Sequence, residues 1–193
     1  GVATVFAASI VEISHFGFGG ESPAIVYDAK SKRSVVINGQ GPAPRAATPA
    51  LFAAKGKVDS NGPLGATVPA MLDAMAIALS EFGTLRLEQV MAPAIELADG
   101  FPMYEFLRHH LTRERKNSEP YASTMRIYYP GGRIPEVGEM FRQPELARTL
   151  RAIVDAEKAA WSKAKDRKAA IQAGRDAFYK GEIARRDRKS TRL

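Results

Sequence analysis

Residues 17–39 read GFGGESPAIVYDAKSKRSVVING, and they carry the clearest structural signal in the chain. Two apolar runs, 24–29 and 34–39, are separated by the polar turn KSKR at 30–33. Runs of β-branched and aromatic residues on both sides of such a turn predict a β-hairpin. The preceding GFGG at 17–20 predicts a glycine-rich loop. The sequence therefore places a hairpin directly after a glycine loop.

Helical patterns account for most of the remaining chain. The apolar N-terminal run predicts a helix that ends near Glu12, and glycines end two later helices. Segments 39–49 and 117–138 lack such a pattern and are expected to be irregular. The other predicted helices cover residues 68–82, 85–99, 103–116, 143–160 and 169–179. The chain is therefore expected to be mainly helical with one hairpin.

Three residues define details of these helices. Thr67 and Thr84 stand just before two of them, where a hydroxyl can cap the first turn. Pro93 lies inside the 85–99 segment and lacks the amide hydrogen that a helix interior uses. We therefore expect N-caps at both threonines and a kink or a division of the second helix at Pro93.

The charge of the chain is concentrated at its C-terminal end. Residues 1–150 carry 15 basic and 15 acidic side chains, whereas residues 151–193 carry 13 basic and 6 acidic ones, so the net charge of +7 arises there. A basic nucleic-acid-binding module is one interpretation of this excess. No aromatic side chains alternate with the basic run, as single-strand binding would require. We instead expect a solvated helix face, a disordered basic tail at 187–193 and no nucleic-acid partner.

Composition excludes several classes of site. The 193 residues include no cysteine, which excludes disulfides, thiolate metal sites and cysteine nucleophiles. No apolar stretch reaches the roughly 18–20 residues that a membrane-spanning helix needs. The chain opens with Gly1 and an apolar run typical of a buried element, so we expect a fragment or a processed subunit.

The histidines and glycines do not form a recognisable catalytic set. His15 has two interpretations, a base or phosphate contact and a hydrogen-bonded structural histidine, and we expect the second. His109 and His110 point about 100° apart on a helix, so we expect no metal site. The third glycine of a dinucleotide motif would fall on Ser22, and a strand follows that loop, so we expect no nucleotide site.

Seven short motifs follow one another along residues 1–186. They are the block 7–29 with its glycine loop and hairpin, APRAATP at 43–49, GPLGATVP at 62–69, FGTL at 82–85, MAPAIELADGFPM at 91–103, PEVGEMFRQPELARTL at 135–150 and AFYKGEIA at 177–184. In this order they resemble the N-terminal, large-subunit region of the gamma-glutamyltranspeptidase family. Members of this family are Ntn-type amidohydrolases that are made as one precursor and cut into two chains.

The resemblance implies an α+β fold. This chain would supply the large-subunit part of an Ntn-hydrolase αββα sandwich, mostly helical, with its β-hairpin near residues 24–39. Residues 1–186 would form a partial domain, truncated at both ends. The implied partner is a small subunit whose N-terminal threonine is the nucleophile, and no cofactor is implied. The compartment would be periplasmic or extracellular, with the cytoplasm left open.

The resemblance also implies a reaction and two substrate-binding residues. The reaction would be acyl transfer or hydrolysis of a γ-glutamyl-type amide, and this chain alone would be inactive because it holds no catalytic residue. Family members bind the substrate α-carboxylate with an arginine just before the APxxAT segment; here that position is Gln40, or Pro42 in a transpeptidase-like branch. Arg45 lies nearby and is the expected substitute.

The absence of the arginine leaves two hypotheses. A neutral hydrogen bond from Gln40 stabilises a carboxylate less than a charged one, so the chain resembles a divergent branch with weak recognition of free γ-glutamyl substrates. The alternative is a non-catalytic, transpeptidase-derived scaffold or binding protein.

Overall fold

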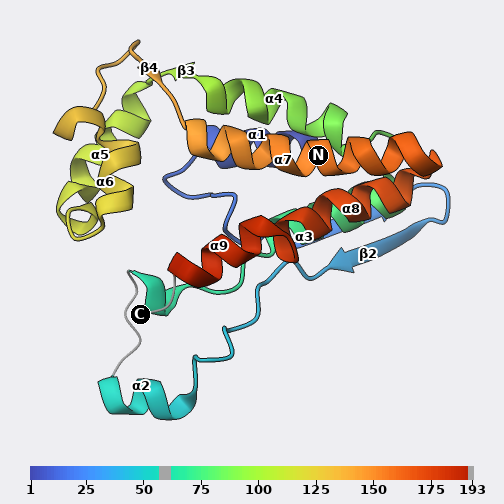
Figure 1. Cartoon of the computed structure of the whole chain (residues 1–193), viewed down its shortest axis with the longest axis horizontal. Helices are drawn as coiled ribbons and strands as arrows, with labels where there is room; N and C mark the ends of the chain where they lie inside the picture. Colours follow the sequence, from blue (N-terminus) through green and yellow to red (C-terminus); the bar gives the residue numbers. More distant parts are fainter. Residues whose placement is uncertain (57–61, 191–193) are drawn as a thin grey trace.

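A computed structural model describes residues 1–56 and 62–190 of the chain. It is mostly helical, with two small two-stranded sheets (Figure 1). The helices are α1 (Val2–Val11), α2 (Pro49–Lys55), α3 (Met71–Phe82), α4 (Leu87–Asp99), α5 (Glu105–Ser118), α6 (Ala122–Tyr128), α7 (Pro144–Ala164), α8 (Arg167–Tyr179) and α9 (Glu182–Ser190). The strands are β1 (Ala24–Asp28), β2 (Arg33–Ile37), β3 (Phe101–Pro102) and β4 (Met140–Phe141), and short 3₁₀ turns occupy Pro63–Gly65 and Pro130–Gly132.

The predicted hairpin is confirmed. Strands β1 and β2 pair antiparallel, with Ile25 opposite Val36 and Tyr27 opposite Ser34. Alternate residues of β1 are exposed, because the other face of this strand lies toward α3. The sheet of β3 and β4 is much smaller and joins the end of α4 to the segment before α7.

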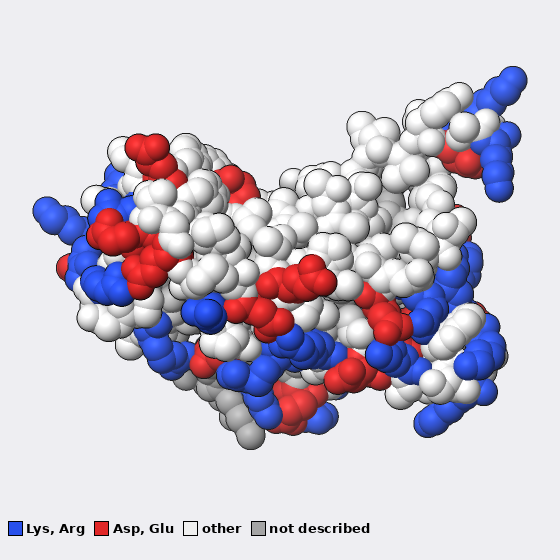
Figure 2. Space-filling view, turned by 90° about the horizontal axis from the view of Figure 1, so that it is seen from above, with Lys and Arg blue, Asp and Glu red and all other residues white. Residues whose placement is uncertain are grey.

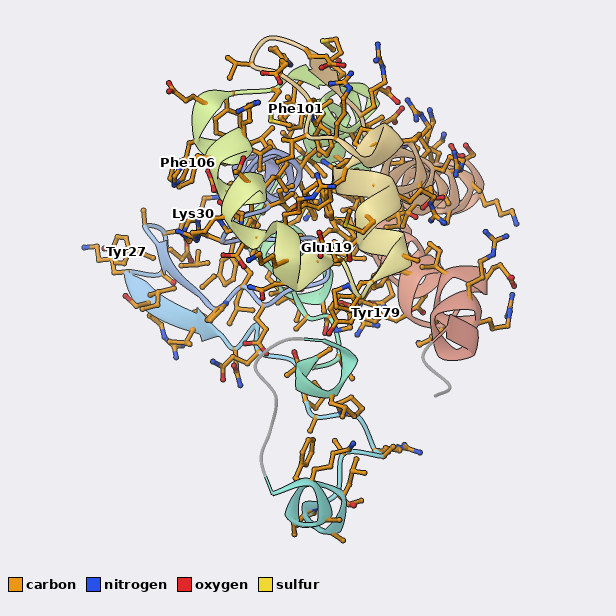
Figure 3. The ribbon with its side chains drawn as sticks, turned by 90° about the vertical axis from the view of Figure 1, so that its left-hand side faces the viewer. Tyr27, Lys30, Phe101, Phe106, Glu119 and Tyr179 are labelled. Atoms are coloured by element: carbon orange, nitrogen blue, oxygen red, sulfur yellow. The ribbon has the colours of Figure 1, made fainter. Side chains whose placement is uncertain are left out.

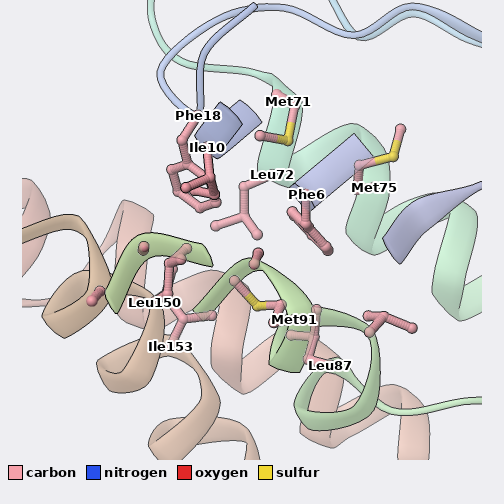
Figure 4. Close-up of a cluster of buried hydrophobic side chains, with 14 of the residues drawn as sticks. Phe6, Ile10, Phe18, Met71, Leu72, Met75, Leu87, Met91, Leu150 and Ile153 are labelled. Carbon is pink, nitrogen blue, oxygen red and sulfur yellow. The ribbon is translucent and has the colours of Figure 1, made fainter. Parts of the chain in front are cut away.

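The core lies among α1, α3, α4, α7 and α8. Phe6 and Ile10 from α1 are fully buried and meet Met91 of α4 and Leu150 of α7 in one apolar cluster (Figure 4). Gly174 allows α8 to approach α7 closely, since a Cβ there would lie 3.1 Å from the Ile153 carbonyl oxygen. The helical periodicity of the sequence therefore identified the elements that form the core.

The predicted cap at Thr67 is wrong. Helix α3 begins at Met71, and the amides of Ala70 and Met71 both donate to the Gly20 carbonyl oxygen at 3.0 Å. The Thr67 hydroxyl instead donates to Glu21 at 3.0 Å. The Gly20 carbonyl oxygen, and not the threonine hydroxyl, thus accepts hydrogen bonds from the amides at the start of this helix.

The predicted cap at Thr84 is also wrong, and of the two alternatives predicted at Pro93, a kink or a division, the division does not occur. Helix α4 begins after Arg86, whose amide donates to the Gln89 side chain at 3.0 Å in a capping box. The helix then continues through Pro93 to Asp99. Pro93 is exposed while Met91 and Ala94 on either side of it are buried, so packing holds both halves of the helix together.

The irregular segment expected at 117–138 contains structure. Helix α6 and the turn at 130–132 lie within it, and the buried Tyr129 hydroxyl donates to the Leu111 carbonyl oxygen at 2.8 Å. A seven-residue helix is too short for its periodicity to stand out in sequence, and tertiary contacts hold it in place.

The C-terminal segment continues as helix α9 as far as Ser190. Residues 191–193 of the predicted basic tail lie outside the described residues, so the domain limits of 1–186 and 187–193 stay a prediction. Within the part of the chain that the structure describes, no helix is both long and apolar enough to cross a membrane.

Candidate functional site

The segment 39–42, which contains Gln40, runs tightly between two other backbones. The Gly39 carbonyl oxygen accepts from the Ser22 amide at 2.9 Å, and the Pro42 carbonyl oxygen accepts from the Val68 amide at 3.0 Å. A Cβ at Gly39 would lie 2.1 Å from the Ser22 carbonyl oxygen. A Cβ at Gly41 would lie only 1.9 Å from the Val68 carbonyl oxygen, so glycine is required at both positions.

One carboxylate joins these backbones. Oε1 of Glu21, the residue directly after the glycine loop, accepts from the Gly41 amide at 3.2 Å and from the Thr67 hydroxyl at 3.0 Å. We call this pair of hydrogen bonds the Glu21 bridge. It connects the end of the glycine loop with segment 39–42 and with the approach to α3, so three motifs of the sequence meet at one half-buried side chain.

The two predicted substrate-binding residues, Gln40 and Arg45, lie before and after Gly41 along the chain. Gln40 is exposed between the two confined glycines, and its backbone amide donates to the Asn38 side chain at 3.3 Å. Arg45 is exposed farther along the loop and lines a large open cavity, whereas Gln40 is not among the described residues that line it. The structure therefore places Arg45 on the cavity wall and leaves Gln40 outside the described lining.

The cavity is larger than a typical small-molecule pocket. Its volume is about 2010 Å³, and it opens between α2, α6, the start of α7 and the junction of α8 with α9. Typical small-molecule pockets measure about 300–1,000 Å³. Its lining is mainly apolar and includes Phe16, Phe52, Tyr128 and Phe178. A surface of this size and character suits a protein segment.

The outer face of the hairpin is also uncovered. Ile25, Tyr27 and Val36 are 76%, 64% and 69% exposed, and in the described residues neither β1 nor β2 has a further strand on its outer edge. Tyr27 projects outward on the same side as Phe106, which is 51% exposed (Figure 3). A broad part of the molecular surface carries no charged side chains (Figure 2). Apolar groups exposed together in this way mark an interaction surface.

His15 lies at the end of α1 in a network of hydrogen bonds. Its Nδ1 lies 2.8 Å from the Ser14 hydroxyl and 3.3 Å from Glu12 Oε1, and its ring stacks on Phe106. The Ser14 hydroxyl holds the pKa of Glu12 below its usual value. These contacts agree with a hydrogen-bonded structural histidine. In residues 1–56 and 62–190, no group of three or more His, Asp or Glu side chains could hold a metal ion.

One buried carboxylate lies away from the cavity. Glu157 of α7 is fully buried, its Oε1 is 3.4 Å from Arg86, and its Oε2 has no hydrogen-bond partner among the described residues. Burial raises the pKa of Glu157. Arg86 also lies over the Trp161 ring at 4.9 Å. The Arg86–Glu157 contact joins the start of α4 to α7, and among the described residues neither side chain lines the cavity.

Comparison with known proteins identifies the family. The sequence model described as Gamma-glutamyltranspeptidase matches residues 1–189, nearly the whole chain. The chain belongs to the gamma-glutamyltranspeptidase family. The predicted resemblance and the α+β fold are both confirmed.

Individual relatives of this gamma-glutamyltranspeptidase-family chain include two from Bacillus subtilis (strain 168). It is 29% identical to a glutathione hydrolase proenzyme, over 95% of this chain and 30% of the relative. It is 33% identical to the glutathione hydrolase-like YwrD proenzyme, over 96% of this chain and 32% of the relative. The structure is similar to that of Helicobacter pylori gamma-glutamyltranspeptidase, with a TM-score of 0.83, 26% identity, and 98% and 51% of the two chains covered.

The chain thus spans about a third of the length of these curated relatives. Sequence reasoning found the family but missed Glu21 and assigned Thr67 to another role. The one signal that could have drawn attention to Glu21 is an acidic residue placed directly after a glycine loop. Its partners are 20 and 46 residues away, and no local pattern predicts such contacts.

Proposed function

We propose that this chain is the large-subunit portion of a gamma-glutamyltranspeptidase-like amidohydrolase. The observation that carries the proposal is the family match over residues 1–189. The relatives named above are a glutathione hydrolase proenzyme and a glutathione hydrolase-like proenzyme, which supports hydrolysis or transfer of a γ-glutamyl-type amide. A second chain or later segment supplies the nucleophile in this proposal.

The uncovered surfaces support a partner of substantial size. The hairpin exposes Ile25, Tyr27 and Val36 on one face, and a 2010 Å³ cavity lies open beside α2. Two-stranded hairpins are marginally stable unless further strands or helices cover them. A small subunit that continues the sheet and covers this face would bury these side chains, as the αββα sandwich requires.

The proposed chemistry is acyl transfer through a threonine on the partner. The threonine Oγ attacks the amide carbonyl carbon, and its own α-amine takes the hydroxyl proton and passes it to the departing amine. Water or an amine then attacks the acyl-enzyme ester and releases the threonine. This chain contributes substrate contacts and the surface on which the partner is held.

Gln40 and Arg45 are the proposed substrate-binding residues. A glutamine amide can donate one or two hydrogen bonds to a carboxylate but brings no charge. Hydrogen bonds to charged groups are strongest when both partners are ionised, as in an arginine–carboxylate pair. We therefore propose weak recognition of the free γ-glutamyl α-carboxylate, with Arg45 on the cavity wall as the nearest cation on this loop.

The test uses the protein produced from its complete gene. Hydrolysis of a γ-glutamyl anilide that exceeds the rate of a variant lacking the N-terminal threonine supports the proposal. Residues 1–193 alone are expected to show no turnover. The neutral Gln40 also favours a second candidate, a non-catalytic scaffold of the same family. Absence of turnover for any γ-glutamyl or related amide by the complete protein would favour that candidate.

A further inference from the structure

We infer that Glu21 is a positioning residue for substrate binding, and that it acts by holding segment 39–42 in one conformation. This inference rests on the proposed function and deepens it, because it concerns how the loop that carries Gln40 is fixed. Glu21 does not touch substrate in this account. It acts through the backbone of Gly41 and the side chain of Thr67.

The geometry gives Glu21 a special place among the contacts of this loop. Both donors of the Glu21 bridge converge on the same oxygen, Oε1, at 3.2 Å from the Gly41 amide and 3.0 Å from the Thr67 hydroxyl. Hydrogen bonds to an ionised acceptor are about twice as strong as neutral ones. The bridge therefore adds a carboxylate contact, from a residue 20 positions away, to the backbone contacts that hold segment 39–42.

The neighbouring contacts leave the segment little freedom once the bridge is formed. Gly39 is fixed on one side by the Ser22 amide, and Pro42 is fixed on the other by the Val68 amide. The bridge fastens Gly41 between these two points. Gln40 is the one residue between the confined glycines, and its side chain is exposed. A rigid backbone on both sides reduces the conformational entropy that Gln40 must lose when it binds a ligand.

Loss of the Glu21 bridge should affect substrate binding rather than the chemical step. When the bridge is lost, segment 39–42 samples other conformations and binds the acyl donor in only a fraction of them. The apparent affinity falls by that fraction, while the reaction of bound substrate continues as before. KM for the acyl donor should therefore rise while kcat stays nearly unchanged.

The experiment compares variants of the complete, processed protein with a γ-glutamyl anilide as donor. Glu21→Ala removes the bridge and is expected to raise KM about tenfold with kcat within about twofold of the parent. Glu21→Gln keeps an acceptor oxygen at the same place but removes the charge, so it should recover part of the loss. Glu96→Ala, which removes an exposed carboxylate on α4, is the matched control and should leave both constants unchanged.

A second measurement reports on the loop itself. Hydrogen exchange at the Gly41 amide should be faster in Glu21→Ala and unchanged in Glu96→Ala. Where Glu21→Ala does not fold, Thr67→Val carries the test, because it removes one of the two donors, and its expected rise in KM is about threefold.

The outcomes separate this inference from the proposed function. If the parent enzyme is active and Glu21→Ala changes neither KM nor exchange at Gly41, the positioning role is wrong. It is also wrong if exchange accelerates while KM stays the same, or if kcat falls with KM unchanged. If the parent itself turns over no acyl donor, the proposed function fails, and the positioning role falls with it.

Discussion

Replacing Gly41 with alanine tests the packing that fixes the candidate substrate loop. The added Cβ would lie 1.9 Å from the Val68 carbonyl oxygen and 3.0 Å from the Thr67 hydroxyl. The nearer of these atoms is backbone, which cannot rotate away as a flexible side chain can. One of the two backbones must therefore move by more than 1 Å, since carbon and oxygen in ordinary contact stay about 3.4 Å apart.

The cost follows from the contacts that this movement breaks. The Gly41 amide loses Glu21 at 3.2 Å, and the Val68 amide loses the Pro42 carbonyl oxygen at 3.0 Å. Each hydrogen bond contributes about 1 kcal/mol, and an inserted methyl group in a tight site costs about 1–3 kcal/mol. Part of the cost of inserting the methyl group disappears as the loop relaxes. The loop should therefore be destabilised by about 2–4 kcal/mol in total.

The assay is native-state hydrogen exchange at the Val68 amide, which reports the opening of this contact. A loss of 2–4 kcal/mol corresponds to exchange about 30- to 700-fold faster. Gly17→Ala is the matched control, because a Cβ at Gly17 meets no atom within 4 Å and its backbone needs no left-handed conformation. Equal exchange rates in the two variants would refute this account of the packing.

Three further predictions concern substrate charge, pH and the anchoring of α3. Gln40→Arg should raise kcat/KM for γ-glutamyl anilides about 2- to 30-fold, because a charged hydrogen bond replaces a neutral one; no change would place Gln40 away from the donor carboxylate. Burial raises the pKa of Glu157, so folding favours its protonated form, and stability should fall as pH rises from the unfolded value near 4.5 through the raised folded one. Glu157→Gln should flatten that part of the pH profile measured by chemical denaturation, and an unchanged slope would contradict the assignment. Tyr179→Phe should lower the free energy of unfolding by about 1–2 kcal/mol, because the hydroxyl accepts from the Asp73 amide and donates to the Pro69 carbonyl oxygen; a loss below about 0.3 kcal/mol would show that water replaces both contacts.

The elements that sequence predicted well are those with local patterns. The hairpin at 24–37 combines β-branched runs with a polar turn, and the long helices repeat apolar residues at helical spacing. Each of these signals lies within the element that it predicts. The boundaries of the predicted helices were less accurate. The start of α3, for example, depends on the Gly20 carbonyl, about 50 residues earlier in the chain.

The contacts of the candidate site were harder to predict for the same reason. Thr67 looks like an N-cap in sequence, yet its hydroxyl is bound to a carboxylate 46 residues away. Pro93 looks like a helix break, yet buried neighbours hold α4 together around it. The family resemblance supplied Gln40 and Arg45, whereas the role of Glu21 emerges only when three separate segments lie together in space.

The central claim is that this chain works with a second chain that begins with threonine. Intact-mass analysis under denaturing conditions, with N-terminal sequencing of every chain in the purified native protein, tests it most directly. Two chains in equal amounts are expected, the second with threonine at its N-terminus. A single uncut chain, or a second chain that begins with a residue lacking a nucleophilic side chain, would contradict it.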